Sequence, residues 1–139
     1  MLRRLRTEPV VPAPPPATSR RRWTAADAAG AAYVLLRAGA GLLFMAHGLQ
    51  KLFGFFGGSV VPLASRMGVA GVLELVGGLL IVLGLFTRPV ALILAAEMLV
   101  AYVIAHLPRG MVPLQNGGEL ALLYALIFIF LALTPRARD

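Results

Sequence analysis

The sequence predicts an all-α integral membrane protein: a four-helix bundle preceded by a disordered arm rich in basic residues and proline. Two observations lead to this prediction. Of the 139 residues, 59% are hydrophobic and only 14% are charged, whereas charged residues make up about 25% of a soluble globular domain. Between residues 28 and 134, apolar blocks recur that can cross a hydrocarbon core of roughly 30 Å, which takes about 20 helical residues.

Residues 1–27 are expected to form a disordered cytoplasmic arm. Its many prolines do not fit a helix interior. Arg20, Arg21 and Arg22 stand just before the first apolar block and act as a topology signal under the positive-inside rule. Binding of the arm to anionic lipid head groups is a second interpretation. A cleaved twin-arginine export signal is disfavoured, because the apolar block that follows is too long and contains Arg37.

Glycine and proline separate the four expected helices. Gly54 follows the first apolar block, and Pro89 suits the first turn of the third helix, where its missing amide hydrogen is not needed. Pro108 and Pro135 follow the third and fourth blocks. The expected helices are 28–53, 68–86, 89–107 and 117–133, followed by a cytoplasmic tail over 135–139.

The distribution of basic residues predicts the orientation. Four crossings place both termini on one side of the membrane, and the arginine-rich arm favours the cytoplasm for that side. Arg88 then also lies inside, whereas Lys51, Arg66 and Arg109 lie toward the outer side. The net charge of +7 is explained by this topology, so we expect no nucleic-acid binding.

Polar residues share single faces of the first two helices. Arg37, His47 and Lys51 lie within an arc of about 80° when successive residues are placed 100° apart. In the second helix, Glu74 shares its face with Gly71 and Gly78, which permit close approach of another helix. Ionisable groups inside a membrane are costly unless they face protein, so we expect these side chains to point into the bundle.

Depth along the helices predicts which groups meet. At a rise of 1.5 Å per residue, Arg37 and Glu97 lie about 13 and 12 Å from the cytoplasmic side, which predicts a buried ion pair. His47 and Glu74 fall about 10 and 9 Å from the outer side, with Lys51 nearer the boundary. Two interpretations stay open: these charges only fix helix packing, or His47 and Glu74 exchange protons with a bound substrate.

The segment before the fourth helix has a capping pattern. Asn116 followed three residues later by Glu119 is typical of a capping box, which is the favoured interpretation of Glu119. Alternatively, Gly117 and Gly118 let a ligand ring approach the backbone near the helix N-terminus. The predicted polar site comprises His47, Lys51, Glu74, Asn116 and Glu119.

The sequence also disfavours several chemistries, and no catalytic residue can be assigned from it. The absence of cysteine removes disulfides, iron–sulfur clusters and thiolate metal sites, and we expect no metal site. Haem between His47 and His106 is disfavoured because the two differ by about 9 Å in expected depth. A small proton-coupled transporter is a weaker alternative, since four helices show no inverted repeat.

Five segments resemble a known family. They are LRAG at 36–39, HGLQKLFG at 47–54, ELVGG at 74–78, GLFTR at 84–88 and NGGE at 116–119. In this order they resemble the DoxX family of small four-helix membrane proteins, over nearly the whole chain after the arm. The positions that the family pattern emphasises are Arg37, Gly48, Lys51, Glu74, Gly78, Arg88 and Glu119.

The resemblance implies a bacterial inner-membrane protein in a redox setting. Some relatives are associated with quinone-linked sulfur oxidation, and others with membrane-bound redox or oxidative-stress complexes. We therefore expect an accessory or quinone-handling subunit of a redox complex, in which His47, Lys51 and Glu74 orient or protonate quinone carbonyl oxygens. No covalently bound cofactor is expected, so quinone would be the exchangeable carrier. The alternative is a non-catalytic scaffold that anchors a soluble oxidoreductase; turnover and homo-oligomerisation stay open.

Overall fold

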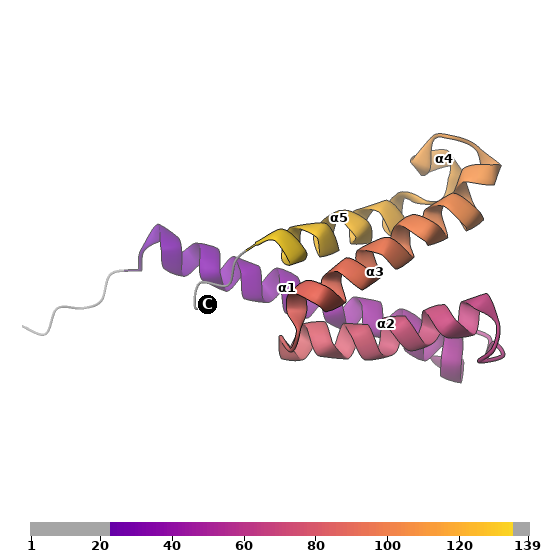
Figure 1. Ribbon diagram of the computed structural model, residues 1–139, viewed down its shortest axis with the longest axis horizontal. Coiled ribbons are helices and arrows are strands. Elements are labelled where there is room, and N and C mark those ends of the chain that lie inside the picture. The colour runs from indigo at the N-terminus through magenta and orange to yellow at the C-terminus, as the bar shows by residue number, and fades with distance from the viewer. Residues whose placement is uncertain (1–22, 135–139) are drawn as a thin grey trace, which may run out of the picture.

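The computed structural model describes residues 23–134, and its regular structure over that range is entirely helical (Figure 1). The long helices are α1 (Ala25–Phe53), α2 (Arg66–Leu83), α3 (Thr87–Ala101) and α5 (Glu119–Leu133). The short elements are the 3-10 turn η1 (Phe55–Gly57), the π-helical η2 (Tyr102–His106), the 3-10 turn η3 (Leu107–Arg109) and α4 (Pro113–Asn116). The all-α prediction is confirmed.

Within residues 23–134, three helical segments are long and apolar enough to cross a membrane. They are Ala25–Phe53, Arg66–Leu83 and Thr87–Arg109, the last of which includes the π-helical and 3-10 turns that continue α3. Helix α5 is also apolar but shorter, with 15 residues. These lengths and compositions agree with the expected membrane bundle.

Helix α1 begins earlier than expected because its first turn is capped. The hydroxyl oxygen of Thr24 accepts a hydrogen bond from the Asp27 amide at 3.2 Å, and the Asp27 carboxylate accepts one from the Thr24 amide at 3.0 Å. Such a capping box satisfies amides that have no partner inside the helix. Residues 25–27, expected in the arm, are therefore the first residues of α1. Outside the described residues lie Arg20, Arg21 and Arg22 of the expected arm, and the expected tail 135–139.

Two left-handed residues set the turn between α2 and α3. Helix α2 ends at Leu83, before the expected residue 86, because Gly84 adopts φ 72°, a conformation that glycine reaches without strain. Phe86 is also left-handed, with φ 49°. Helix α3 then begins at Thr87, so Pro89 falls in its first turn, as its sequence position predicts. The chain reverses within this short link.

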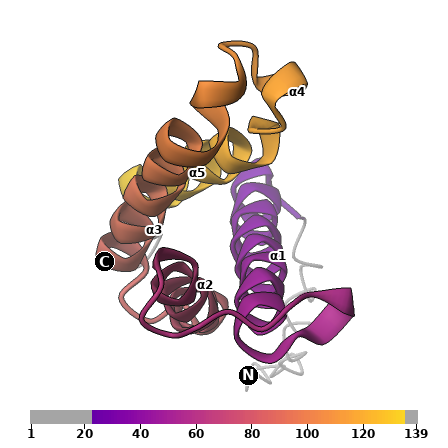
Figure 2. The same ribbon diagram turned by 90° about the vertical axis from the view of Figure 1, so that its right-hand side faces the viewer.

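The long helices form two packed pairs. Helix α1 packs mainly on α2, and α3 packs mainly on α5, while α2 and α3 make the principal contact between the pairs. Figure 1 shows the pairs meeting where α2 turns into α3 and diverging toward the end that carries α4. The view turned by 90° shows the same separation, with α4 on the opposite side from α2 (Figure 2). We call this end, with α4 and the C-terminal end of α1, the open end.

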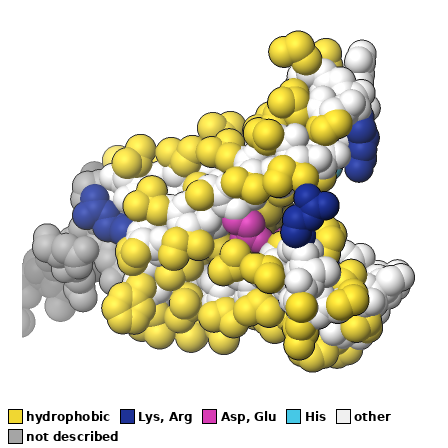
Figure 3. Space-filling model, turned by 45° about the vertical axis from the view of Figure 1, so that its right-hand side comes forward, with side chains coloured by type: hydrophobic (Ala, Val, Ile, Leu, Met, Phe, Trp, Pro, Cys, Tyr) yellow, Lys and Arg dark blue, Asp and Glu magenta, His cyan; other side chains and the backbone are white. Residues whose placement is uncertain are grey.

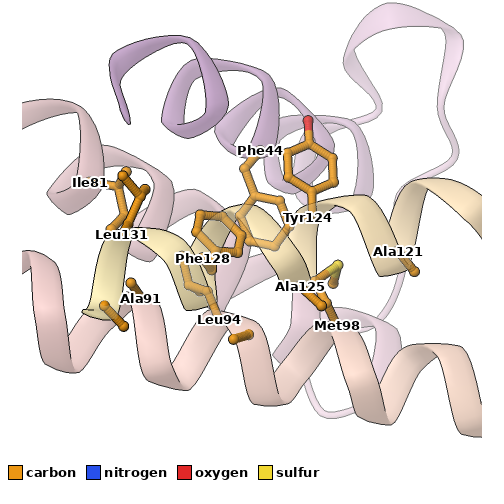
Figure 4. Packing of buried hydrophobic residues seen from close by; sticks show 12 residues of the cluster. Phe44, Ile81, Ala91, Leu94, Met98, Ala121, Tyr124, Ala125, Phe128 and Leu131 are labelled. Carbon is orange, nitrogen blue, oxygen red and sulfur yellow. The ribbon is translucent and has the colours of Figure 1, made fainter. Parts of the chain in front are cut away.

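Aromatic and aliphatic side chains fill the space between the pairs (Figure 4). The Phe44 ring of α1 contacts two rings of α5, with centroids 5.0 Å from Tyr124 and 4.8 Å from Phe128. Tilted and edge-on ring pairs of this kind are favourable beyond their buried area. Leu94 of α3 and Ile81 of α2 are also buried, so all four long helices contribute to the core.

Glycine brings α1 and α2 into backbone contact. A Cβ atom at Gly48 would lie 2.5 Å from the Leu75 amide nitrogen and 2.6 Å from the Gly71 carbonyl oxygen. A Cβ atom at Gly41 would lie 2.8 Å from the Gly78 carbonyl oxygen. Real Cβ atoms do not approach backbone so closely, so these positions require glycine, as close helix crossings in membranes commonly do.

Candidate functional site

Five polar side chains, contributed by all four long helices, gather between the two pairs. Lys51 Nζ donates to Glu74 Oε1 at 2.5 Å, joining α1 to α2. Glu97 of α3 is close enough to interact electrostatically with both of these groups. His47 and Tyr124 interact electrostatically with Glu74, from α1 and α5 respectively. The polar cluster, as we call it, comprises His47, Lys51, Glu74, Glu97 and Tyr124.

The glycine contact between α1 and α2 positions the Lys51–Glu74 pair. A Cβ atom at Gly71 would lie 3.1 Å from Lys51 Cβ, so the absence of a side chain there lets the lysine lie along α2. Glu74 follows Gly71 on the same helix face and is only 3% exposed. The Lys51 side chain is 21% exposed. The Lys51–Glu74 ion pair therefore extends from the buried α1–α2 contact toward the space between the two helix pairs.

Three carboxylate oxygen atoms of the polar cluster lack hydrogen-bond partners. Both Oε atoms of Glu97 and the Oε2 atom of Glu74 are buried, and no group of the described residues donates to them. Buried polar atoms are normally paired, and each unpaired acceptor costs about 1–3 kcal/mol. Such atoms are therefore candidates for hydrogen bonds to a bound ligand.

His47 and Tyr124 form the aromatic side of the polar cluster. Their rings meet edge to face with centroids 6.0 Å apart. Tyr124 also packs on Phe44 in the core, so its ring joins the apolar and polar parts of the interior. Sequence reasoning did not select Tyr124. The available signal was a phenol in the interior of an otherwise apolar helix, because a buried tyrosine hydroxyl usually finds a polar partner.

The predicted Arg37–Glu97 ion pair is wrong. Arg37 Nη1 donates to the carbonyl oxygen atoms of Ile81 and, at 3.0 Å, Val82. These carbonyls lie in the last turn of α2, where the partial negative charge of the helix C-terminus attracts a cation; the Ile81 carbonyl oxygen also accepts from the Gly84 amide at 3.1 Å. Depth counting failed because the first turns of α1 extend beyond the end of α2 (Figure 1). Arg37 is therefore level with the last turn of α2, whose carbonyl groups it contacts. Glu97 lies further along α3 and belongs to the polar cluster.

Arg88 makes the equivalent contact in the other pair. Its Nε atom donates to the carbonyl oxygen of Ala132 at 3.1 Å, close to the end of α5. Arg88, which was expected to act as a topology signal, therefore also donates a hydrogen bond to a carbonyl group near a helix C-terminus. The two arginines tie together the end of the bundle opposite the open end.

Asn116 and Glu119 do not join the polar cluster. Asn116 is buried, and its amide group donates to the Gly110 carbonyl oxygen at 2.7 Å and to the Tyr102 hydroxyl at 3.4 Å. Its Oδ1 atom accepts from the Gly118 amide at 2.8 Å. These bonds hold α4 against the end of α3, on the arm that diverges from α1 and α2 (Figures 1 and 2).

The predicted capping box at Asn116 is also wrong. Asn116 is the last residue of α4, and Gly117 follows with φ 72°. Helix α5 then begins at Glu119, with Gly118 as its N-cap and no side-chain cap. The asparagine side chain therefore closes a local turn, which asparagine forms readily. Glu119 is exposed.

The polar cluster lies where the two pairs begin to diverge. Figure 3 shows acidic side-chain atoms in the middle of a largely apolar face, with basic side chains between them and the open end. Within residues 23–134, no group of three or more histidine or acidic side chains is arranged to hold a metal ion. The cluster offers both hydrogen-bond donors, on Lys51, His47 and Tyr124, and unpaired acceptors, on the two glutamates.

Comparison with known proteins places the chain among membrane proteins of one family. A sequence model of the DoxX family matches residues 32–107. An uncharacterised protein of Haemophilus influenzae is 44% identical over 95 residues, covering 63% of this chain and 71% of the relative. A Bacillus subtilis protein named "Putative oxidoreductase CatD" is 35% identical over 107 residues, covering 73% of this chain and 77% of the relative. No solved structure matches the chain. The residues of the polar cluster, other than Tyr124, lie within the matched region, and the chain belongs to the DoxX family.

Proposed function

We propose that this DoxX protein is a quinone-handling or accessory subunit of a membrane-associated redox complex. The observation that carries the proposal is the polar cluster itself. Five polar groups from the four long helices converge beside an exposed apolar surface. Groups of this kind inside a membrane commonly mark the path of a substrate or proton. A relative named as an oxidoreductase supports the redox setting.

The polar cluster suits the head group of a quinone. Lys51 has ammonium hydrogens beyond the one that Glu74 accepts, so it can donate to a carbonyl oxygen while the ion pair holds it in place. His47 and the Tyr124 hydroxyl supply further donors. The exposed aliphatic side chains of α2 and α3 would accept the isoprenoid tail. Electrons would come from a separate redox partner, and protons from the cluster.

Binding measurements on the intact protein test this function. The protein would be extracted in native lipid and analysed by native mass spectrometry for retained quinone and for partner proteins. Glu74→Gln should abolish quinone retention, because Lys51 loses the carboxylate that orients it. Glu119→Gln removes an exposed carboxylate outside the cluster and is the matched control. Equal quinone retention in both variants would contradict the proposal.

A scaffold role is the second candidate, and one observation favours it. The Lys51–Glu74 pair lies beside the closest contact of α1 with α2, so the pair could serve only to lock this crossing. A scaffold would bind its oxidoreductase partner without retaining quinone. Undiminished partner assembly in Glu74→Gln, with no quinone in the parent protein, would favour this role.

We also propose that the protein lies in the bacterial inner membrane with both termini in the cytoplasm. Arg88 contacts the end of α5 and Arg37 contacts the end of α2, so the start of α3 and the ends of α2 and α5 share one side of the bundle. The arginine-rich segment before α1 favours the cytoplasm for that side. A C-terminal fusion to a reporter that is active only outside the cytoplasm should be inactive.

A further inference from the structure

We propose that Glu97 holds a proton at neutral pH and donates it in a hydrogen bond to a carbonyl oxygen of the bound quinone. The inference rests on the proposed quinone-handling function and adds a ligand-binding group to it. It follows from the positions of the two glutamates of the polar cluster relative to its single lysine.

The lysine of the polar cluster is already paired with Glu74. Lys51 Nζ donates to Glu74 Oε1 at 2.5 Å, and Glu74 is only 3% exposed. Lys51 is the only lysine of the chain. Arg37 and Arg88 contact backbone carbonyl groups at the other end of the bundle. The negative charge of Glu74 is therefore matched within the cluster, and no second lysine is available for the other glutamate.

Glu97 has a carboxyl group without a partner. Both of its Oε atoms are buried, and no group of the described residues forms a hydrogen bond with them. Glu74 acts on Glu97 more strongly than Lys51 does, and it opposes a second negative charge there. Of the other polar groups in the cluster, His47 acts on Glu74, and Tyr124 is an uncharged phenol. A carboxyl group buried without a countercharge takes up a proton, because the ionised form loses its hydration.

Glu97 lies next to the exposed apolar surface of α3. Ile93 and Val100, one helical turn before and after it on the same face, are both exposed. Acidic side-chain atoms are visible among apolar side chains on one face of the molecule (Figure 3). A quinone whose tail lies along these aliphatic side chains would bring its head group beside Glu97. Rotation of the flexible glutamate side chain would then turn its buried carboxyl group toward the ring.

A neutral carboxylic acid suits a quinone carbonyl. Its hydroxyl donates a hydrogen bond and its other oxygen still accepts, whereas a carboxylate can only accept. The oxygens of a quinone also only accept, so an ionised Glu97 could form no hydrogen bond with them. Lys51 donates from the α1–α2 pair and Glu97 from the α3–α5 pair. Each helix pair can therefore hold one of the two carbonyl oxygens of a quinone.

Infrared spectroscopy tests the protonation state directly. The full chain would be reconstituted at neutral pH in vesicles of diether phospholipid, which has no ester carbonyl group to mask the signal. The spectrum should contain the C=O stretching band of a protonated carboxylic acid, and this band should be lost in Glu97→Gln. Glu119→Gln is the matched control and should retain the band, because Glu119 is exposed. Absence of the band from the parent protein, or its persistence in Glu97→Gln, would overturn the inference.

Binding of a decyl-substituted benzoquinone, measured against protein-free vesicles by equilibrium dialysis, tests the hydrogen bond. Glu97→Gln keeps an uncharged donor and should bind the quinone within about twofold of the parent protein. Glu97→Met has a similar size but no donor, and should bind roughly fivefold more weakly, the ratio expected for one lost hydrogen bond. Both variants should keep the circular dichroism of the parent protein, because neither buries a charge.

Two outcomes separate this inference from the function on which it rests. Equal quinone binding by Glu97→Met and the parent protein would overturn the inference while leaving quinone handling intact. A parent protein that shows the infrared band but binds no quinone would reject the proposed function, and the hydrogen bond with it.

Discussion

The two helix pairs hold together by different means. Helices α1 and α2 meet through glycine, backbone against backbone, whereas α3 and α5 meet through interlocking side chains such as Leu94 and Phe128. The glycine contact leaves no space for an added methyl group, yet it supports the buried Lys51–Glu74 pair. The side-chain contact is apolar and supplies the wall beside that pair. Close backbone packing of α1 and α2 thus positions the Lys51–Glu74 ion pair, and α3 and α5 pack beside it.

The strongest test of this contrast adds a side chain to the glycine contact. Gly48→Leu should destabilise the folded protein by more than about 3 kcal/mol, because its Cβ alone would lie 2.5 Å from backbone. Gly39→Leu is the control, since a Cβ at Gly39 meets nothing within 4 Å. Unfolding in mixed detergent, followed by circular dichroism, compares the two. Similar stability of both variants would mean that α1 and α2 are not in backbone contact.

Removing an aromatic ring from the α3–α5 contact should destabilise the protein less and more locally. Phe128→Ala should cost about 3 kcal/mol, because Phe128 is completely buried and its loss leaves a cavity. Phe128→Leu should cost about 1 kcal/mol, since the side-chain contact can rearrange. The same unfolding assay measures both. Equal losses for the two substitutions would show that this pair is as rigid as the glycine contact.

The arginine contacts allow the pairs to be compared at equivalent places. Arg37→Gln and Arg88→Gln should each cost about 1.5–3 kcal/mol, because each removes a charged donor from carbonyls near a helix C-terminus. Trypsin cleavage rates in nanodiscs, alongside unfolding, would show whether one helix end loosens. A loss of stability in only one of the two variants would indicate that only one helix pair depends on its arginine.

The smallest expected effect is a coupling energy near zero between Arg37 and Glu97. Their substitutions to Gln should be additive within about 0.5 kcal/mol, because the two side chains bind different parts of the molecule. The same cycle on Lys51 and Glu74 should give a coupling of about 0.5–3 kcal/mol. Strong coupling of Arg37 with Glu97 would restore the ion pair predicted from depth.

Local sequence patterns predicted the helices better than they predicted which side chains of different helices are in contact. Apolar length and glycine or proline positions located four helices within a few residues, because these features act within a single helix. The face of Glu74 was predictable because Gly71 and Gly78 must face a neighbouring helix. The end of α2 and the start of α3 differ from the expected positions because Gly84 and Phe86 adopt left-handed conformations. Composition does not reveal such backbone conformations.

Contacts between helices depend on how far each helix is displaced along its axis. Depth counting assumed that all four begin at one level, but α1 extends beyond the others (Figure 1), and this removed Arg37 from Glu97. Divergence of the pairs likewise separated Asn116 from Lys51. A sequence gives the order of residues within a helix but not the angle between pairs, so the composition of the polar cluster required the structure.

The short α5 has a consequence for the surrounding lipid. Its 15 residues span about 22 Å, whereas a bilayer hydrocarbon core is roughly 30 Å thick. Met111 and Leu114, exposed in the segment just before α5, extend the apolar surface on this arm. A hydrophobic segment that is too short is accommodated by local thinning of the bilayer or by oligomerisation. Acyl-chain length should therefore act on the same arm whose divergence from α1 and α2 begins beside the polar cluster.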